Sequence, residues 1–284
     1  MKRFWVLGVV LGLAWAQSIQ VEVKGELAQV ETQALAALKA NGLEADRILN
    51  LGGQIRQITG AAFPDYHLVV LKPEAGSLAA ASKNPMAAIV LPPTVYVHAA
   101  KAGVTTVGTF DGRLMFSLLG VAGPETDGLT SRLEASLGRL GKLERIAPAM
   151  MPDPKSGMMP ALLYFVSGAK AEDMVLLLEG ELTSRGLNLT PNIKVGPATV
   201  IMPCKSEWAR IMFSAQPAGG FAAPCRFFAV DMPGGALVGA IEPMLMTIMP
   251  GVMGSPAVAM LQEARKTIIE VLQSTGGVPY RPGQ

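Results

Sequence analysis

One pattern occurs twice in this chain, and the two occurrences lie 132 positions apart (204 − 72). In the first, a helix-like stretch begins at Lys72, passes through Asn-Pro and leads at Pro93 into a strand-like run. In the second, a helix-like stretch begins at Cys204, passes through Gln-Pro and leads at Cys225 into a strand-like run. Both spans measure 21 positions (93 − 72 and 225 − 204), without an insertion. Such a repeat predicts two similar domains.

The first sixteen residues have the pattern of an export signal. A Lys-Arg pair at positions 2 and 3 precedes the apolar run 4–13 and an Ala-Trp-Ala cleavage site before Gln17. The apolar run is shorter than the roughly 20 residues that span a bilayer. An N-terminal membrane anchor is the alternative, and the cleavage site argues against it. We therefore expect a signal peptide at 1–16 and a periplasmic or secreted bacterial protein.

Composition bounds the remaining chain. Without residues 1–16 it has 268 residues (284 − 16), enough for two domains of about 130 residues. Half of all residues are hydrophobic and 16% are charged, with a net charge of +2. Acids and bases are interspersed, and no basic cluster suggests nucleic acid or anionic lipid. No later run is suited to membrane insertion, so we expect a soluble chain whose partner is a small molecule or a protein.

Periodicity predicts strand, helix, three or four strands with a short helix among them, and a closing helix in each repeat. This order favours the α+β class, with mainly antiparallel sheets and helices on one face. The predicted domains are 17–146 and 161–273, joined by a Met/Pro-rich linker at 147–160 and followed by a polar tail at 274–284. The predicted closing helices are 128–146 and 256–273. Gly42 and Gly186, which end the first helices, lie 144 apart, so the first repeat holds twelve extra residues (144 − 132), placed in 52–64.

The motifs of the second repeat resemble the family known as domain of unknown function 302. The resemblance rests on Met202-Pro203-Cys204, Ala223-Pro224-Cys225-Arg226, Ile241-Glu242-Pro243 and the helix from Pro256. It covers roughly 160–273, and the first repeat looks like a diverged copy in which Lys72 and Pro93 replace the cysteines. The resemblance implies a βαβ4α fold similar to that of the TATA-binding protein in each repeat. It implies no activity.

Cys204 and Cys225 are the only cysteines. The proposed topology brings both to one end of a sheet, where an oxidising compartment favours a disulfide. Such a bridge would add about 3 kcal/mol of stability. A reactive thiol pair, a soft-metal site or two buried free thiols remain alternatives, although the spacing fits neither C-x-x-C nor a structural zinc site.

Methionine is abundant, with sixteen in the chain. A spacing similar to that of exported copper(I) proteins is found at Met244, Met246, Met249 and Met253. Thioethers are soft ligands, which suit Cu(I). The competing interpretation is that these methionines fill irregular gaps in the core. Copper(I) is therefore the alternative cofactor, with Cys204 and Cys225 as further ligands.

No other set of residues indicates chemistry. His67 and His98, the only histidines, lie on predicted strands, and no carboxylate in the sequence is evidently placed to orient either ring. We interpret Trp208 as a cap over a sheet edge, the arginines 132, 139 and 145 as the solvated face of the first closing helix, and the Gly-Gly pairs as turns. No nucleophile–base pair, phosphate-binding loop or dinucleotide fingerprint is present, which argues against an enzyme. We expect an intramolecular pseudo-dimer of the repeats, with a binding groove between them, and a thiol-redox or copper(I)-handling role as the alternative.

Overall fold

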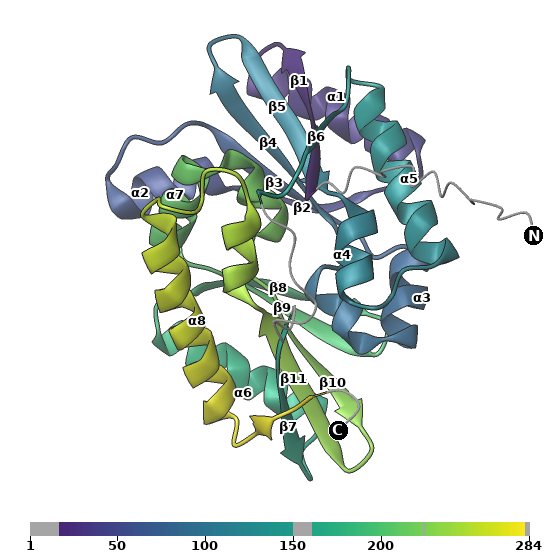
Figure 1. The fold of residues 1–284 in the computed structure, drawn as a ribbon, viewed down its shortest axis with the longest axis vertical. Helices are drawn as coiled ribbons and strands as arrows, with labels where there is room; N and C mark the ends of the chain where they lie inside the picture. Colours follow the sequence, from purple (N-terminus) through teal and green to yellow (C-terminus); the bar gives the residue numbers. More distant parts are fainter. Residues whose placement is uncertain (1–16, 150–160, 224, 282–284) are drawn as a thin grey trace, which may run out of the picture.

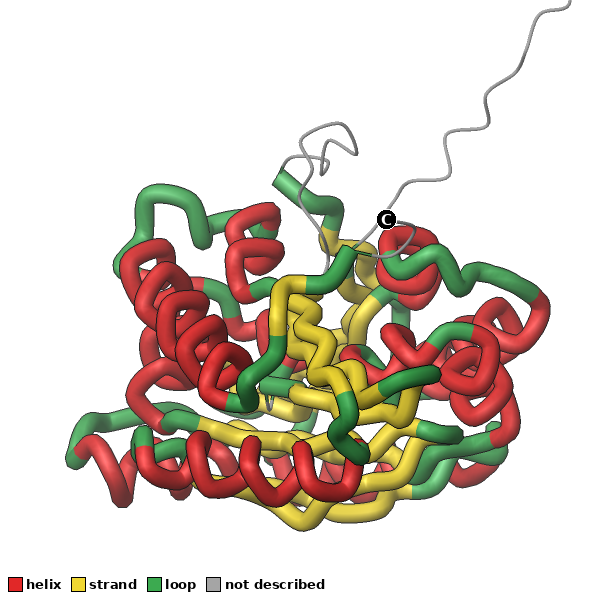
Figure 2. Tube along the Cα trace, turned by 90° about the horizontal axis from the view of Figure 1, so that it is seen from below, coloured by secondary structure: helices red, strands yellow, loops and turns green. Residues whose placement is uncertain are grey.

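The computed structural model describes residues 17–149, 161–223 and 225–281. The predicted signal peptide and most of the predicted linker lie outside these residues. Within them the chain forms two six-stranded sheets, one from each half of the sequence, and every strand pair is antiparallel. Strands gather in the middle of the molecule and helices lie around them (Figure 2). The predicted α+β class is confirmed.

The first half, residues 17–146, has the sheet order β2-β3-β4-β5-β1-β6. Its elements are β1 (Ser18–Lys24), α1 (Leu27–Ala40), β2 (Ala45–Asn50), α2 (Leu51–Thr59), β3 (Tyr66–Leu71), α3 (Ala75–Lys83), η1 (Pro85–Ile89), β4 (Thr94–Lys101), β5 (Val104–Phe110), α4 (Gly112–Leu118), α5 (Pro124–Gly138) and β6 (Glu144–Ile146), where η marks a 3-10 helix.

The second half, residues 161–281, has the sheet order β12-β7-β11-β10-β9-β8. Its elements are β7 (Ala161–Ser167), α6 (Ala171–Ser184), β8 (Asn188–Val195), β9 (Ala198–Cys204), α7 (Ser206–Ala215), η3 (Pro217–Ala222), β10 (Phe227–Met232), β11 (Gly235–Ile241), η4 (Pro243–Ile248), α8 (Ala257–Ser274) and β12 (Val278–Pro279). If this order is reversed, each strand matches its counterpart in the first half. The sequence repeat therefore holds for strand order and connection.

The extra residues of the first half include the nine-residue helix α2, which has no counterpart between β8 and β9. Asn50 caps the helix by accepting from the Gly53 amide at 2.8 Å, and Gly60 ends it with a φ of 66°. A Cβ on Gly52 would lie 2.7 Å from the Tyr66 amide nitrogen, so the helix needs glycine to approach β3. The two glycines of its first turn explain why periodicity alone did not predict it.

Other boundaries also differ from the prediction. The closing helix α5 ends at Gly138, and residues 144–146 form an edge strand beside β1. The predicted polar tail contains β12, which pairs with β7 at one edge of the second sheet, as β6 pairs with β1 in the first. These short edge strands carry too few residues for an alternating pattern to stand out.

The two halves contact each other reciprocally. η3 of the second half packs on β1, β4 and β5, and η1 of the first half packs on β9, β10 and β11. The extra helix α2 lies beside α7 (Figure 1). In the first sheet, η3 meets the Tyr66 face, whereas the adjacent His67 points to α1 on the other face.

Candidate functional site

Two cavities in the described residues are lined by the second half alone. The smaller, of about 80 Å³, lies between α7, η3, η4 and α8. Five sulfur-containing side chains line it, so we call it the sulfur-lined cavity: Cys204, Cys225, Met212, Met246 and Met260. The larger, of about 1030 Å³, is an open groove between β7, α8 and the residues around β12.

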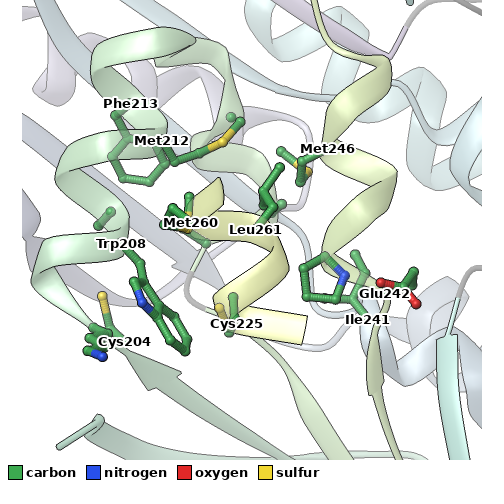
Figure 3. A pocket seen from close by; sticks show the side chains of 17 residues that line it. Cys204, Trp208, Met212, Phe213, Cys225, Ile241, Glu242, Met246, Met260 and Leu261 are labelled. Atoms are coloured by element: carbon green, nitrogen blue, oxygen red, sulfur yellow. The ribbon is translucent and has the colours of Figure 1, made fainter. Parts of the chain in front are cut away.

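Each sulfur reaches the sulfur-lined cavity from a different element (Figure 3). Cys204 is the last residue of β9, and Cys225 lies between η3 and β10. Met212 comes from α7, Met246 from η4 and Met260 from α8. Apolar side chains complete most of the wall, and Lys205 and Glu242 are its charged members. A cavity of this composition suits an apolar or soft ligand.

The two cysteines are free thiols, so the predicted disulfide is wrong. The ladder between β9 and β10 pairs Ile201 with Phe227 and then stops. If it continued by two residues, Cys225 would lie opposite residue 203, one position out of step with Cys204. Both cysteines lie beyond the last pair of this ladder, and both line the sulfur-lined cavity as free thiols.

Both thiols are protonated at neutral pH. Burial raises the pKa of Cys204 to about 12, and the neighbouring Cys225 adds to the rise. Burial also raises the pKa of Cys225 to about 11, against a smaller lowering effect of Arg226. Because the thiolate is the nucleophile, these shifts oppose thiol-redox reactivity.

The four methionines singled out by spacing do not come together. Met246 lines the sulfur-lined cavity, and Met244 lines the larger groove. Met249 is fully buried in the core, and Met253 is 55% exposed. Sequence spacing missed Met212 and Met260, because the cavity joins α7 and α8 rather than a single segment.

Trp208 forms part of the cavity wall, at the end of α7 near Cys204. Its indole Nε1 donates to Glu263 Oε1 at 3.1 Å, and Lys205 Nζ lies 4.7 Å from its ring centroid. Lys205 Nζ also lies 3.3 Å from Glu263 Oε1, and these contacts fix the indole between α7 and α8. The sequence-based interpretation of Trp208 as a sheet-edge cap omits this role.

A buried carboxylate separates the two cavities. Glu242 follows β11, lines both cavities and accepts from Arg265 Nε at 2.9 Å and from the Met244 amide at 3.1 Å. Its counterpart after β5 is Asp111, which accepts from Arg145 Nη1 at 2.8 Å. Arg145 therefore belongs to strand β6 and pairs from the surface with the buried Asp111, whereas the prediction placed it on a helix face.

The first half is built differently at the matching position. Trp208 corresponds to Gly76, where a Cβ would lie 2.8 Å from the Glu125 carbonyl oxygen because α3 and α5 approach closely. Arg132 of α5 pairs with Glu74, the N-cap of α3. Small residues and an ion pair thus occupy the place where the second half has an indole and thioethers.

An aromatic stack joins the first half to the cavity wall. The Tyr66 ring lies 4.7 Å from the ring of Phe213, which lines the sulfur-lined cavity, at an interplanar angle of 7°. The Tyr66 hydroxyl donates to the Pro217 carbonyl at 2.6 Å. His98 stacks on the other side of the same network, 5.5 Å from Tyr66. The first half thereby fixes one wall of the cavity.

Arg226 lies at the seam between the halves and is 2% exposed. Its Nη2 donates to the Pro92 carbonyl at 2.9 Å and to the Thr94 hydroxyl, and Thr94 is the equivalent position of the repeat. Its buried Nε has no hydrogen-bond partner. Burial lowers the pKa of Arg226 to about 10. No carboxylate pairs with this guanidinium among the described residues.

The histidines are placed apart, on opposite faces of the first sheet. His67 Nδ1 lies 2.6 Å from Glu31 Oε2 of α1, an orienting carboxylate that the sequence analysis did not identify. His98 is 7% exposed, and burial lowers its pKa. The part of the chain that the structure describes has no group of three or more His, Cys, Asp and Glu side chains placed to hold a metal. Nor does any described helix have the length and apolar character to cross a membrane.

Comparison with known proteins finds a family similarity in the first half. Residues 19–140 match the family model described as Domain of unknown function DUF302. One similar solved structure is that of an uncharacterized conserved DUF302 protein from Bacillus stearothermophilus, at 16% identity and a TM-score of 0.39. The match covers 43% of this chain and 97% of that one. No curated protein matches the chain.

The predicted DUF302 resemblance is thus confirmed for residues 19–140, and a second copy stays a prediction. The match falls on the half in which Lys72 and Pro93 replace the two cysteines. The cysteines are therefore not needed for the family match. The sulfur-lined cavity lies in the other half, outside the matched residues.

Proposed function

We propose that the protein binds a small ligand in the sulfur-lined cavity and that its second half carries the binding role. The observation that carries the proposal is the cavity itself, about 80 Å³ and walled almost entirely by apolar and sulfur-containing side chains. Folded proteins close-pack their interiors, so a cavity of this size has a cost in stability that a ligand offsets. The raised thiol pKa values favour binding over thiol catalysis.

The site differs from the groove expected between the repeats. η1 and η3 pack on the sheet of the opposite half, and they fill the space in which that groove was predicted. The first half instead supports one wall, through Tyr66 on Phe213 and α2 beside α7. We infer an intramolecular pseudo-dimer in which the first half positions α7 and the second half holds the ligand.

Trp208 offers a direct test of occupancy. It is the only tryptophan besides Trp5 and Trp15, so a W5F/W15F background makes its fluorescence specific to the cavity. Titration with 1-alkanols of increasing length should give saturable changes. We expect affinity to rise about 4-fold per methylene, from about 0.8 kcal/mol per buried CH₂, until the chain fills the cavity.

A matched pair of variants on α8 provides the control. Ala264 lines the cavity, and Ala264→Leu should fill part of it and reduce alkanol affinity at least about 10-fold. Ala259 is exposed on the same helix, and Ala259→Leu should leave affinity unchanged. Thermal unfolding of both variants should be recorded, to check that each is folded. Equal alkanol binding by the two variants, or no saturation in the parent, would contradict the proposal.

We also propose that residues 1–16 direct export and are removed. The support is the sequence pattern of a basic start, a short apolar run and an Ala-Trp-Ala site. N-terminal sequencing of protein isolated from its own host should begin at Gln17. A protein that keeps Met1 and remains in the cytoplasm would refute this part.

A further inference from the structure

We propose that the sulfur-lined cavity binds one Cu(I) ion, through the thiols of Cys204 and Cys225 and thioethers among Met212, Met246 and Met260. The proposal rests on the ligand-binding role given above, because it assigns the ligand class of the same cavity. It replaces the ligand set expected from spacing, of which Met246 alone lines this cavity with the cysteines.

The donor set selects a soft ion. Thiolates and thioethers favour Cu(I), whereas Mg²⁺, Ca²⁺ and Mn²⁺ need oxygen ligands. The cavity wall offers five sulfurs, and its one carboxylate, Glu242, is already engaged by Arg265 Nε. With two thiols and no cavity-lining histidine, it also lacks the ligand set of a zinc site.

The sulfurs are not a requirement of the repeated fold. Three of them lie within the repeated span and have counterparts 132 positions earlier: Lys72 for Cys204, Ala80 for Met212 and Pro93 for Cys225. None of these three counterparts contains sulfur, yet the first half forms the same strand order. Met246 does have a sulfur-containing counterpart, Met115, because Glu242 corresponds to Asp111. Both thiols and the thioether of α7 are therefore found in only one of two similar units, which the shared strand order does not require.

Arg226 provides an independent observation. It follows Cys225 directly, is 2% exposed, and has no carboxylate partner and an unpaired buried Nε. A buried cation without a counter-charge is costly. When Cu⁺ binds two thiols, each S–H bond breaks, two Cu–S bonds form, and two protons leave to solvent without any electron transfer. The bis-thiolate complex carries a charge of −1, which balances the +1 of Arg226, and a thioether adds no charge.

The test is an anaerobic Cu(I) titration of the full chain in competition with bicinchoninate, repeated with Ag⁺ as a redox-inert substitute. We expect one equivalent bound more tightly than micromolar. Cys204→Ser and Cys225→Ser should each weaken binding about 100-fold or more, and Met→Leu at positions 212, 246 and 260 should weaken it several-fold in at least one case. Leucine conserves volume, so these variants should fold, and their melts check this.

Met249 and Met253 provide the matched controls. They belong to the set expected from spacing but do not line the cavity, and Met249→Leu and Met253→Leu should leave Cu(I) affinity unchanged. Binding weaker than micromolar, or tight binding indifferent to all three cavity methionines, would overturn the proposal. If 1-alkanols bind and Cu(I) does not, the cavity remains a ligand site and the copper assignment is wrong. If neither binds, both proposals fail.

Discussion

Gly220 permits a close approach between the two halves, so Gly220→Ala tests how tightly they pack against each other. Gly220 lies in η3 and faces Tyr66, which is fully buried. An added Cβ would overlap the Tyr66 hydroxyl and lie 2.8 Å from Tyr66 Cζ and 2.9 Å from Tyr96 Cβ. These distances are shorter than real Cβ contacts, and the two nearest atoms belong to the rigid, fully buried phenol of Tyr66, so Tyr66 has to move.

The expected cost has two parts. Overpacking a close-packed site costs about 1–3 kcal/mol. Movement of Tyr66 also weakens its hydrogen bond to the Pro217 carbonyl, now 2.6 Å, and leaving a buried polar group unpaired costs about 1–3 kcal/mol. We therefore expect Gly220→Ala to lower the free energy of unfolding by about 3 kcal/mol. The measurement is urea denaturation followed by circular dichroism, with m-values compared.

Two further variants make the result specific. Gly180 lies on α6 with open space around its would-be Cβ, so Gly180→Ala should stabilise the protein by up to about 1 kcal/mol through helix propensity. In a Tyr66→Phe background the closest overlap disappears, and Gly220→Ala should cost at least about 1 kcal/mol less. A cost below about 0.5 kcal/mol, or an equal cost in both backgrounds, would refute the close approach of η3 to β3.

Three further results are expected. Gly108→Ala should destabilise the protein by about 1–3 kcal/mol in the same denaturation assay, because its Cβ would overlap the Tyr96 hydroxyl. A neutral result would contradict this contact. Burial lowers the pKa of His98, so as the pH falls the unfolded state binds a proton at this residue before the folded state does. The free energy of unfolding should therefore fall as the pH drops below about 6.5, and it should fall less in His98→Phe. Alkylation of the unfolded protein without reductant should add two groups by mass, and in the native protein Cys204 and Cys225 should react slowly at pH 7, because their pKa values are about 12 and 11; a disulfide-linked mass would refute this.

The sequence predicts the architecture because its signals are local and occur twice. The predicted order of strands and helices recurs in both halves, and the hairpin between β10 and β11 turns at Gly234, whose φ is 83°. The Gly219-Gly220 pair misled the prediction because it was interpreted as a turn. It lies in a 3-10 helix, where glycine serves close packing against Tyr66. Composition cannot distinguish these uses of glycine, since they depend on what lies across the seam.

The candidate site was harder to predict, because its residues come together only through contacts between segments distant in the sequence. Cys204 and Cys225 attract attention as the chain's only cysteines, but whether they form a disulfide depends on a register that the spacing does not fix. Met260 is separated from Cys204 by 56 positions (260 − 204), and only the packing of α8 on α7 brings them to one cavity. Arg226 lay within a recognised motif, yet its lack of a carboxylate partner is visible only after the halves are joined.

The two halves differ in the side chains that lie between the closing helix and the short helix. Between the closing helices and the short helices α3 and α7, the first half places Gly76 and an Arg132–Glu74 pair, which let the layers close. The second half places Trp208 there, and its indole Nε1 donates to Glu263 of α8. Because a packed interior tolerates an opening only at a cost, the cavity beside Trp208 is a feature that the shared strand order alone does not require. The proposed ligand site therefore depends on residues in which the second half differs from the first, while Tyr66 of the first half supports its wall through Phe213.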